Sequence, residues 1–139
     1  MESKIITQLI NSAQKAQKNA HAPYSGFQVG AAVLTEDGNI FCGCNVENAA
    51  YPLGQCAEAT AIGSMVSQGT RTIKAVVIAS PNDELCFPCG GCRQKIAEFA
   101  DDATPIYLVT STGDVEKHTV SELLPHAFRL SHDDTRHKV

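Results

Sequence analysis

The sequence predicts an α/β fold, a three-layer α/β/α sandwich around a mixed five-stranded sheet. Apolar residues near the N-terminus recur with the period of a helix, and short β-branched runs further along are typical of buried strands. The two kinds of segment alternate along the chain, which indicates a mixed sheet with helices on both faces. At 139 residues the chain is long enough for one core and short for two, so we expect a single domain over residues 1–139.

Periodicity and turn signals place the elements in order. Apolar residues between Ile5 and Ala16 recur every three or four positions, and Pro23 helps to end this first helix. The turn-rich segment EDGN at 36–39 predicts a hairpin, and Gly69 closes the second helix. The predicted elements are helices over 2–20, 56–68 and 92–99, strands over 28–35, 39–46, 73–79, 106–110 and 115–119, and a short helix beginning near Ser121.

Composition narrows the class of protein. No apolar run approaches the ~20 residues that cross a bilayer, and the N-terminus lacks the apolar core of an export signal. We therefore expect a cytoplasmic protein without a membrane partner, whose six cysteines are ligands, reactive groups or core residues rather than disulfides. The net charge is −4, and the basic residues are scattered apart from the tail 132–138. This pattern argues against a nucleic-acid partner and favours a small-molecule substrate.

Two cysteine-bearing segments each lie at the start of a predicted helix. Cys89 and Cys92 have the spacing that lets two thiolates chelate one ion, and Cys56 precedes Glu58 by two positions. Such residues lie about 200° apart around a helix, so only in the first turn could both approach one target. The positive end of the helix dipole stabilises thiolates there.

The number of ligands separates the possible kinds of metal site. A catalytic zinc ion takes three protein ligands and a water, whereas a structural one takes four. Cys56, Cys89 and Cys92 supply three, with Glu58 beside them as an acid–base group. A ligand-x-Glu segment followed by Pro-Cys-x-x-Cys is typical of zinc deaminases. A four-thiolate structural site that includes Cys86, an iron–sulfur centre and a redox dithiol remain alternatives.

The other thiols and the imidazoles receive no such assignment. Cys42 and Cys44 share one face of a predicted strand, and we expect them, like Cys86, to be core or surface thiols. The five histidines show no ligand spacing with one another or with the cysteines. The predicted metal site is therefore built from sulfur alone.

Beyond these motifs the sequence resembles cytidine deaminases of the short-chain, three-cysteine zinc type, nearly from end to end. The stretches that carry the resemblance are PYSGFQVGAA at 23–32, NVENAAY at 45–51, CAE at 56–58, PCGGCRQ at 88–94 and ELLPHAF at 122–128. Several ordered motifs at family-like spacings are more specific than one Cys-x-x-Cys pair. The resemblance implies a cytidine deaminase-like fold, one Zn²⁺ per chain and a homotetramer.

The resemblance also implies a role for each matching residue. Cys56, Cys89 and Cys92 would hold zinc, and Glu58 would be the catalytic proton shuttle. The implied substrate-binding positions are Phe27, Asn45, Glu47, Tyr51, Ala57 and Phe128, with Arg93 and Gln94 behind the metal ligands.

Among the substrate positions, the resemblance distinguishes three tasks. Asn45 and Glu47 match a ribose-recognition pair, since an amide and a carboxylate together can donate to and accept from sugar hydroxyls. Phe27 matches an aromatic that packs against the nucleoside. Tyr51 and Phe128 match positions that approach a neighbouring subunit's pocket, with ordinary core packing as the alternative for both.

The implied activity is hydrolytic deamination of cytidine and deoxycytidine to uridine and deoxyuridine with release of ammonia, a step of pyrimidine salvage. Bound zinc would lower the pKa of its water from ~15.7 toward ~7, and Glu58 would relay protons to ring N3 and to the departing amine. The alternatives are an aminonucleoside-antibiotic deaminase of the blasticidin S type and a non-catalytic zinc-stabilised binding module. Charge disfavours a polynucleotide-editing deaminase.

One position departs from the family pattern. The residue after the catalytic glutamate is typically arginine, which hydrogen-bonds the zinc-bound thiolates, but here it is Ala59. Three thiolates and Zn²⁺ leave a net charge of about −1, which should weaken the pull of the metal on its water. Arg93 and the two helix N-termini are the candidates to offset that charge.

Overall fold

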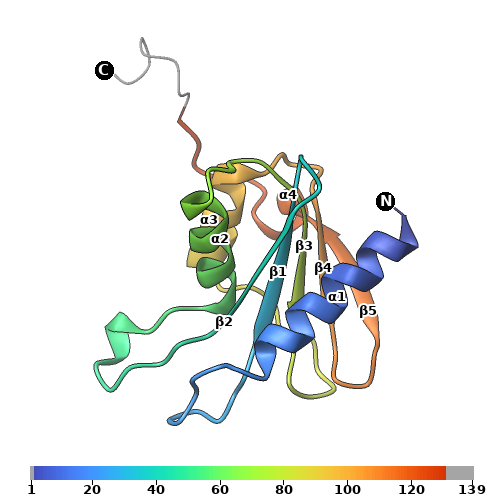
Figure 1. Cartoon of the computed structure of the whole chain (residues 1–139). Coiled ribbons are helices and arrows are strands. Elements are labelled where there is room, and N and C mark those ends of the chain that lie inside the picture. Colours follow the sequence, from blue (N-terminus) through green and yellow to red (C-terminus); the bar gives the residue numbers. More distant parts are fainter. Residues whose placement is uncertain (1, 131–139) are drawn as a thin grey trace.

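The computed structural model describes residues 2–130. The helices are α1 (Ser3–Gln17), the 3₁₀ turn η1 (Tyr51–Leu53), α2 (Ala57–Ser67), α3 (Gly90–Phe99) and α4 (Val120–Leu123). The strands are β1 (Gly30–Thr35), β2 (Ile40–Cys44), β3 (Ile73–Ala79), β4 (Pro105–Val109) and β5 (Val115–Thr119). They form one five-stranded sheet in the order β2-β1-β3-β4-β5 (Figure 1). Only β3 and β4 pair in parallel, which confirms the predicted mixed sheet.

The element boundaries agree best with the prediction where local pattern is strongest. The predicted strands 73–79 and 115–119 agree with β3 and β5 to the residue. In contrast, β1 begins two residues later than predicted and its partner β2 ends two residues earlier. The reason is the Asn45 side chain, which bonds the backbone N–H of Val29 and the carbonyl of Phe27. The backbone N–H of Asn45 still donates to the Val29 carbonyl at 3.3 Å, but the Asn45 carbonyl accepts from His21 instead of from Val29. Regular pairing therefore ends here, and the predicted strands 28–35 and 39–46 are too long at this end. Residues 51–53, for which the sequence predicted no helix or strand, form the turn η1.

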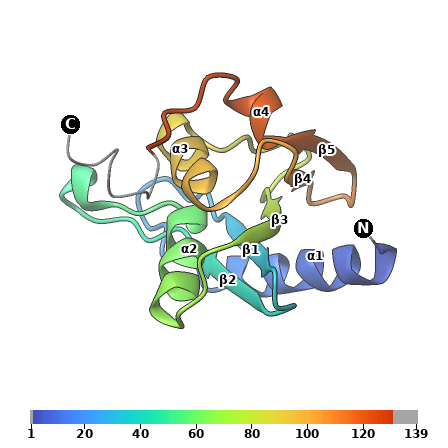
Figure 2. The same ribbon diagram turned by 90° about the horizontal axis from the view of Figure 1, so that it is seen from above.

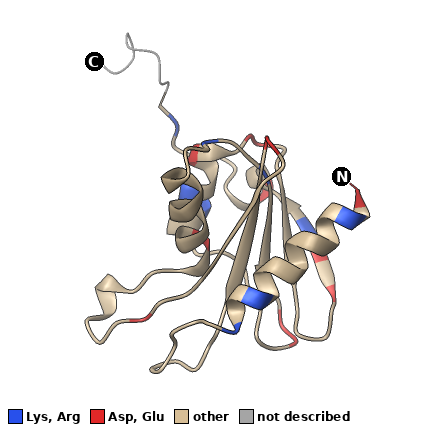
Figure 3. Cartoon of the chain, in the orientation of Figure 1, with Lys and Arg blue, Asp and Glu red and all other residues tan. Residues whose placement is uncertain are grey.

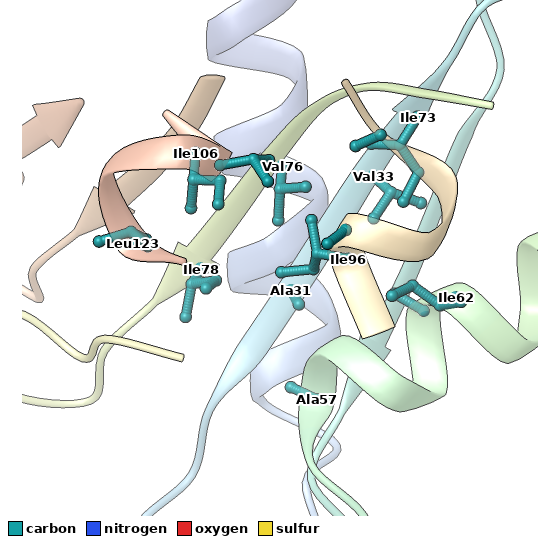
Figure 4. Close-up of a cluster of buried hydrophobic side chains, with 14 of the residues drawn as sticks. Ala31, Val33, Ala57, Ile62, Ile73, Val76, Ile78, Ile96, Ile106 and Leu123 are labelled. Atoms are coloured by element: carbon teal, nitrogen blue, oxygen red, sulfur yellow. The ribbon is translucent and has the colours of Figure 1, made fainter. Parts of the chain in front are cut away.

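The helices divide between the two faces of the sheet. Helix α1 covers one face, and α2 and α3 cover the other (Figure 2). On the α1 side Leu9 packs with the inward residues of the central strands. On the other side Ile96 and Ile62 pack against Val76 and Ala31 (Figure 4). Each fully buried Leu or Ile side chain contributes ~1.5–3 kcal/mol by leaving water, which holds the three predicted layers together.

The topology brings the N-termini of α2 and α3 together. Strand β3 ends at Ala79, and the following loop, residues 80–89, crosses to the start of α3. Ligand sites in sheets of this kind lie beyond the carboxyl ends of the parallel strands. Residues 46 and 55 form an isolated antiparallel bridge that aligns the chain entering α2 beside the end of β2. The start of α2, which carries Cys56, is therefore fixed by backbone pairing.

Basic and acidic side chains are mixed over the surface formed by residues 2–130 (Figure 3). Lysine and arginine lie on several elements, interspersed with acidic residues (Figure 3). The basic tail cluster, residues 132–138, lies outside the described residues. Among the helices within residues 2–130, none combines the length and apolarity that a membrane span requires.

Candidate metal centre

Three thiols converge where α2 and α3 begin. Cys56 is the N-cap of α2, Cys89 is the N-cap of α3, and Cys92 lies in the first turn of α3. Their sulfur atoms all lie within 4.8 Å of one another, and Cys56 Sγ is 3.9 Å from Cys89 Sγ. Neither N-cap sulfur makes a capping hydrogen bond of standard geometry, so both remain available as metal ligands.

The sulfur spacing matches what a zinc ion requires. With Zn–S bonds of about 2.3 Å, tetrahedral geometry separates two thiolates by about 3.8 Å, close to the observed 3.9 Å. Within residues 2–130, these three cysteines form the one group of three or more metal-ligating side chains. Cys86 does not belong to that group, which disfavours the four-thiolate structural site. Three ligands leave one tetrahedral position for water or substrate.

The pKa values of the thiols show the charge that the site must balance. Burial raises the pKa of Cys56 and of Cys92, and neighbouring thiols contribute to both shifts. The backbone N–H of Cys92 lowers the pKa of Cys89. Three thiolates this close repel one another unless a cation lies between them, and a bound divalent ion reverses this balance by deprotonating its thiol ligands. The donor set therefore fits zinc.

Glu58 lies in the first turn of α2 with only 4% of its surface exposed. Burial raises its pKa, while its own backbone N–H and Lys95 act in the opposite direction. Its charge acts to raise the pKa of each of the three clustered thiols, although the pKa of Cys89 is lowered overall by other bonds. A buried carboxyl group whose pKa moves toward neutrality is suited to taking up and releasing protons.

Asn45 and Glu47 both hold the segment that contains Phe27. The Asn45 amide accepts from the N–H of Val29 and donates to the carbonyl of Phe27, each at 2.8 Å. Glu47 accepts from the backbone N–H groups of Tyr24 and Ser25 at 3.0 and 3.1 Å, and from the Ser25 hydroxyl. These bonds, that of the hydroxyl first, lower the pKa of Glu47. Ser25 was not identified from the sequence, although it lies within the PYSG stretch.

A cavity of about 340 Å³ lies next to these residues. It is lined by Tyr24, Ser25, Glu47, Asn48, Tyr51 and Gly54. Val46, between Asn45 and Glu47, pairs with Gln55 through two backbone hydrogen bonds of 2.8 Å. Because Gln55 precedes Cys56, this pairing places the Asn45–Glu47 segment alongside the chain that enters the metal centre.

The two aromatics expected near a neighbouring subunit are both on the surface. Tyr51 in η1 is 77% exposed and Phe128 is 68% exposed, so core packing does not explain either. Gln94 holds the backbone of Phe128, donating to its carbonyl at 2.6 Å and accepting from its N–H at 3.2 Å. Ala57, the first residue of α2, is in contrast fully buried in the hydrophobic core.

Arg93 links the metal-binding loop to the C-terminal region. Its Nε donates to the carbonyl of Pro88 and its Nη1 to that of Leu123, each at 2.8 Å. These two bonds fix the residue before Cys89 against α4. Charge compensation by Arg93 for the thiolates stays a prediction.

Cys86 lies closer to the site than the sequence indicated. It packs against the core cluster below α2 and α3. Its pKa rises to about 11, chiefly through burial, with smaller contributions from Glu58, Cys56 and Cys89. The Cys-x-x-Cys-x-x-Cys run was the available signal, but spacing alone could not show that Cys86 lies outside the ligand group.

Comparison with known proteins agrees with this geometry. Residues 3–108 match the family model described as "Cytidine and deoxycytidylate deaminase zinc-binding region". A cytidine deaminase of Sporosarcina psychrophila is 48% identical over 123 residues, 88% of this chain and 90% of that protein. One from Halalkalibacterium halodurans is 46% identical over 120 residues, 86% of this chain and 91% of that protein.

Solved structures and a relative of different activity complete the comparison. The crystal structure of a cytidine deaminase from Burkholderia pseudomallei superimposes with a TM-score of 0.84 at 41% identity, covering 92% of this chain and all of that one. A blasticidin-S deaminase of Bacillus cereus is more distant, at 36% identity over 105 residues, 70% of this chain and 74% of that protein. The chain belongs to the family of zinc-binding cytidine and deoxycytidylate deaminases.

Proposed function

We propose that the protein catalyses the hydrolytic deamination of cytidine and deoxycytidine to uridine and deoxyuridine, with release of ammonia. The observation that carries the proposal is the buried Glu58 in the first turn of α2, two residues after Cys56, which is one of three cysteines whose sulfurs lie within 4.8 Å of one another. In this assignment Cys56, Cys89 and Cys92 hold one Zn²⁺ per chain, and Glu58 is the catalytic acid–base.

Glu58 moves the protons of the reaction. Zinc, when bound to three thiolates, supplies a polarised water whose pKa falls toward ~7. Glu58 accepts a proton from the attacking water and delivers it to ring N3, which makes C4 electrophilic. It later gives a proton to the departing amino group, so that one water is consumed and one ammonia is released. The raised pKa of its buried carboxyl group favours this exchange between protonation states.

The nucleoside is proposed to lie between the metal centre and the 24–29 loop. Asn45 and Glu47 would bind ribose hydroxyls, and Phe27 would pack against the nucleoside. Both polar side chains already hold the loop backbone, so they are positioned before substrate arrives. The Glu47 carboxylate and the Asn45 amide can still bind ribose hydroxyl groups, because each of their oxygens accepts more than one hydrogen bond.

A homotetramer is proposed as the working assembly, in the cytoplasm and in pyrimidine salvage. Tyr51 and Leu53 of η1 and Phe128 near the C-terminus are large apolar side chains exposed to solvent. Exposed apolar groups of this size are typical of interfaces. The rigid hold of Gln94 on Phe128 would present that ring to another subunit's pocket.

Glu58→Gln tests the proposal directly. The neutral amide keeps the shape of the side chain but cannot exchange protons, so cytidine turnover should fall at least ~100-fold while zinc content stays at one per chain. Absorbance change and ammonia release on cytidine, deoxycytidine and blasticidin S measure the activity. Normal turnover in the zinc-loaded variant would remove Glu58 from this role.

The substrate panel also separates the other two functions. Selective turnover of blasticidin S by the wild-type protein would favour the antibiotic deaminase. Stoichiometric zinc without turnover of any of the three compounds would favour a binding module.

A further inference from the structure

The edge strand β2 carries a second pair of thiols outside the metal centre. Cys42 and Cys44 are free and flank Gly43, whose added Cβ would lie 2.5 Å from the backbone nitrogen of Ala61 on α2. Gly43 therefore faces α2. Because side chains alternate along a strand, Cys42 and Cys44 both face the opposite side, toward α1.

A cavity of about 450 Å³ lies over this pair. It is lined by Ser12, Lys15, Ala16 and Asn19 of the α1 region, by Cys42, Gly43 and Cys44, and by Thr60. Among these described lining residues Lys15 is the only charged side chain, so the local charge is positive before any thiol ionises. The two thiols also interact electrostatically: burial raises the pKa of Cys44, and the charge of Cys42 raises it further.

The strand geometry favours a bridging ion over a disulfide. Residues two apart on a strand have Cα atoms about 6.7 Å apart, at the upper end of the roughly 4.4–6.8 Å that disulfides span. A direct S–S bond would therefore require the strand to bend. An ion at about 2.3 Å from each thiolate permits sulfurs up to about 4.6 Å apart, which needs far less distortion.

We propose that Cys42 and Cys44 form a two-coordinate site for one soft monovalent ion, with Cu(I) as the biological example. Thiolates select soft ions, and two ligands fall short of the four that zinc prefers. On binding, the two S–H bonds break and release two protons to solvent, two S–Cu bonds form, and no electron is transferred. The product carries a charge of −1, which the Lys15 ammonium on the same cavity wall offsets.

This site is independent of the proposed deaminase reaction and separate from the zinc ligands. Gly43, between the two cysteines, faces α2, where an added Cβ would lie 2.5 Å from the backbone nitrogen of Ala61 and 2.8 Å from the carbonyl oxygen of Ala57. The Cys42 and Cys44 side chains project from the opposite face of β2, toward α1. A bound soft ion should therefore leave zinc in place.

Anaerobic titration of the zinc-loaded full chain with Cu(I), in competition with bathocuproine disulfonate, tests the site. One Cu(I) per chain should bind while zinc stays bound. Cys42→Ser and Cys44→Ser should each lower affinity by more than the roughly 10–100-fold that loss of an outer partner costs a metal site. Lys15→Gln should weaken binding about threefold to tenfold, whereas its matched control Lys4→Gln, at the far end of α1, should not.

Two outcomes would overturn the proposal. Equal Cu(I) uptake by the folded serine variants would exclude these thiols as ligands, and release of one zinc per Cu(I) bound would place copper in the Cys56 cluster. X-ray absorption of the Cu(I)-loaded wild type needs no variant. It should show two sulfur neighbours, and three would contradict the site.

Discussion

Ala59 lies directly after Glu58 on α2 and is almost fully buried beside the thiol cluster. Its methyl group leaves the cluster without the guanidinium that the family typically places there. Among the described residues, Arg93 Nε and Nη1 each donate to a carbonyl oxygen, so these two bonds are not directed at sulfur. The local charge at residue 59 should therefore set the pH at which the reaction becomes efficient.

Ala59→Arg should shift the acidic limb of the pH–rate profile to lower pH. The added cation offsets thiolate charge, which strengthens the pull of the metal on its water and lowers the pKa of that water. Overpacking should cost ~1–3 kcal/mol of stability. Ala59→Met, which adds length without charge, is the control for packing. An acidic limb that stays in place would mean that the charge is already balanced elsewhere.

Glu47→Gln should reveal the contribution of the ionised carboxylate to the 24–26 loop. The hydrogen bonds from Ser25 and Tyr24 lower the pKa of Glu47 from its ordinary value of 4.5. A lowered folded-state pKa means that the stabilisation is present above about pH 4.5 and lost as the pH falls through the folded value. The wild type should therefore exceed the variant in stability at pH 7, and the difference should shrink toward pH 3.5.

Urea unfolding midpoints at the two pH values measure this effect. Glu36→Gln in the β1–β2 hairpin is the control for losing one surface charge. A difference between wild type and Glu47→Gln that is the same at both pH values would show that the loop bonds do not depend on ionisation.

At the scale of elements, the contact between β2 and α2 positions the metal centre. Gly43 lets the strand approach the first turns of the helix so closely that an added Cβ would lie 2.8 Å from the carbonyl oxygen of Ala57. The helix start that carries Cys56 and Glu58 is therefore set by the strand behind it. Loss of this close approach should disturb the site as well as the core.

Gly43→Ala and Gly63→Ala make a matched pair for this contact. Gly43→Ala should cost ~1–3 kcal/mol through overpacking against helix backbone and should weaken zinc binding, because α2 must move. Gly63 lies on the same helix with nothing within 4 Å of an added Cβ, so Ala there should stabilise by up to ~1 kcal/mol. Unfolding midpoints and zinc competition with a chelator measure both. Unchanged zinc affinity in Gly43→Ala would show that the contact between β2 and α2 does not position the metal ligands.

At the scale of the whole molecule, apolar side chains remain exposed at η1 and near Phe128. Tyr51→Ser with Leu53→Ser should convert the proposed tetramer into smaller species, measured by light scattering, since the lost burial weakens association. Val115→Ser on the β5 edge, also exposed, is the control. A double variant with the mass of the wild type would exclude η1 from the interface.

The sequence by itself determined the α/β class, the order of the elements, β3 and β5 to the residue, and the three cysteines that converge. Each of these depends on local pattern: β-branched runs, Cys-x-x-Cys spacing and helix starts. The tertiary structure alone decided that Asn45 interrupts the β1–β2 pairing and that Cys86 stays outside the ligand group. It also decided that Arg93 binds carbonyl groups and that Cys42 and Cys44 face α1. These features depend on which distant segments meet, and that is set by packing across the sheet rather than by any neighbouring residue.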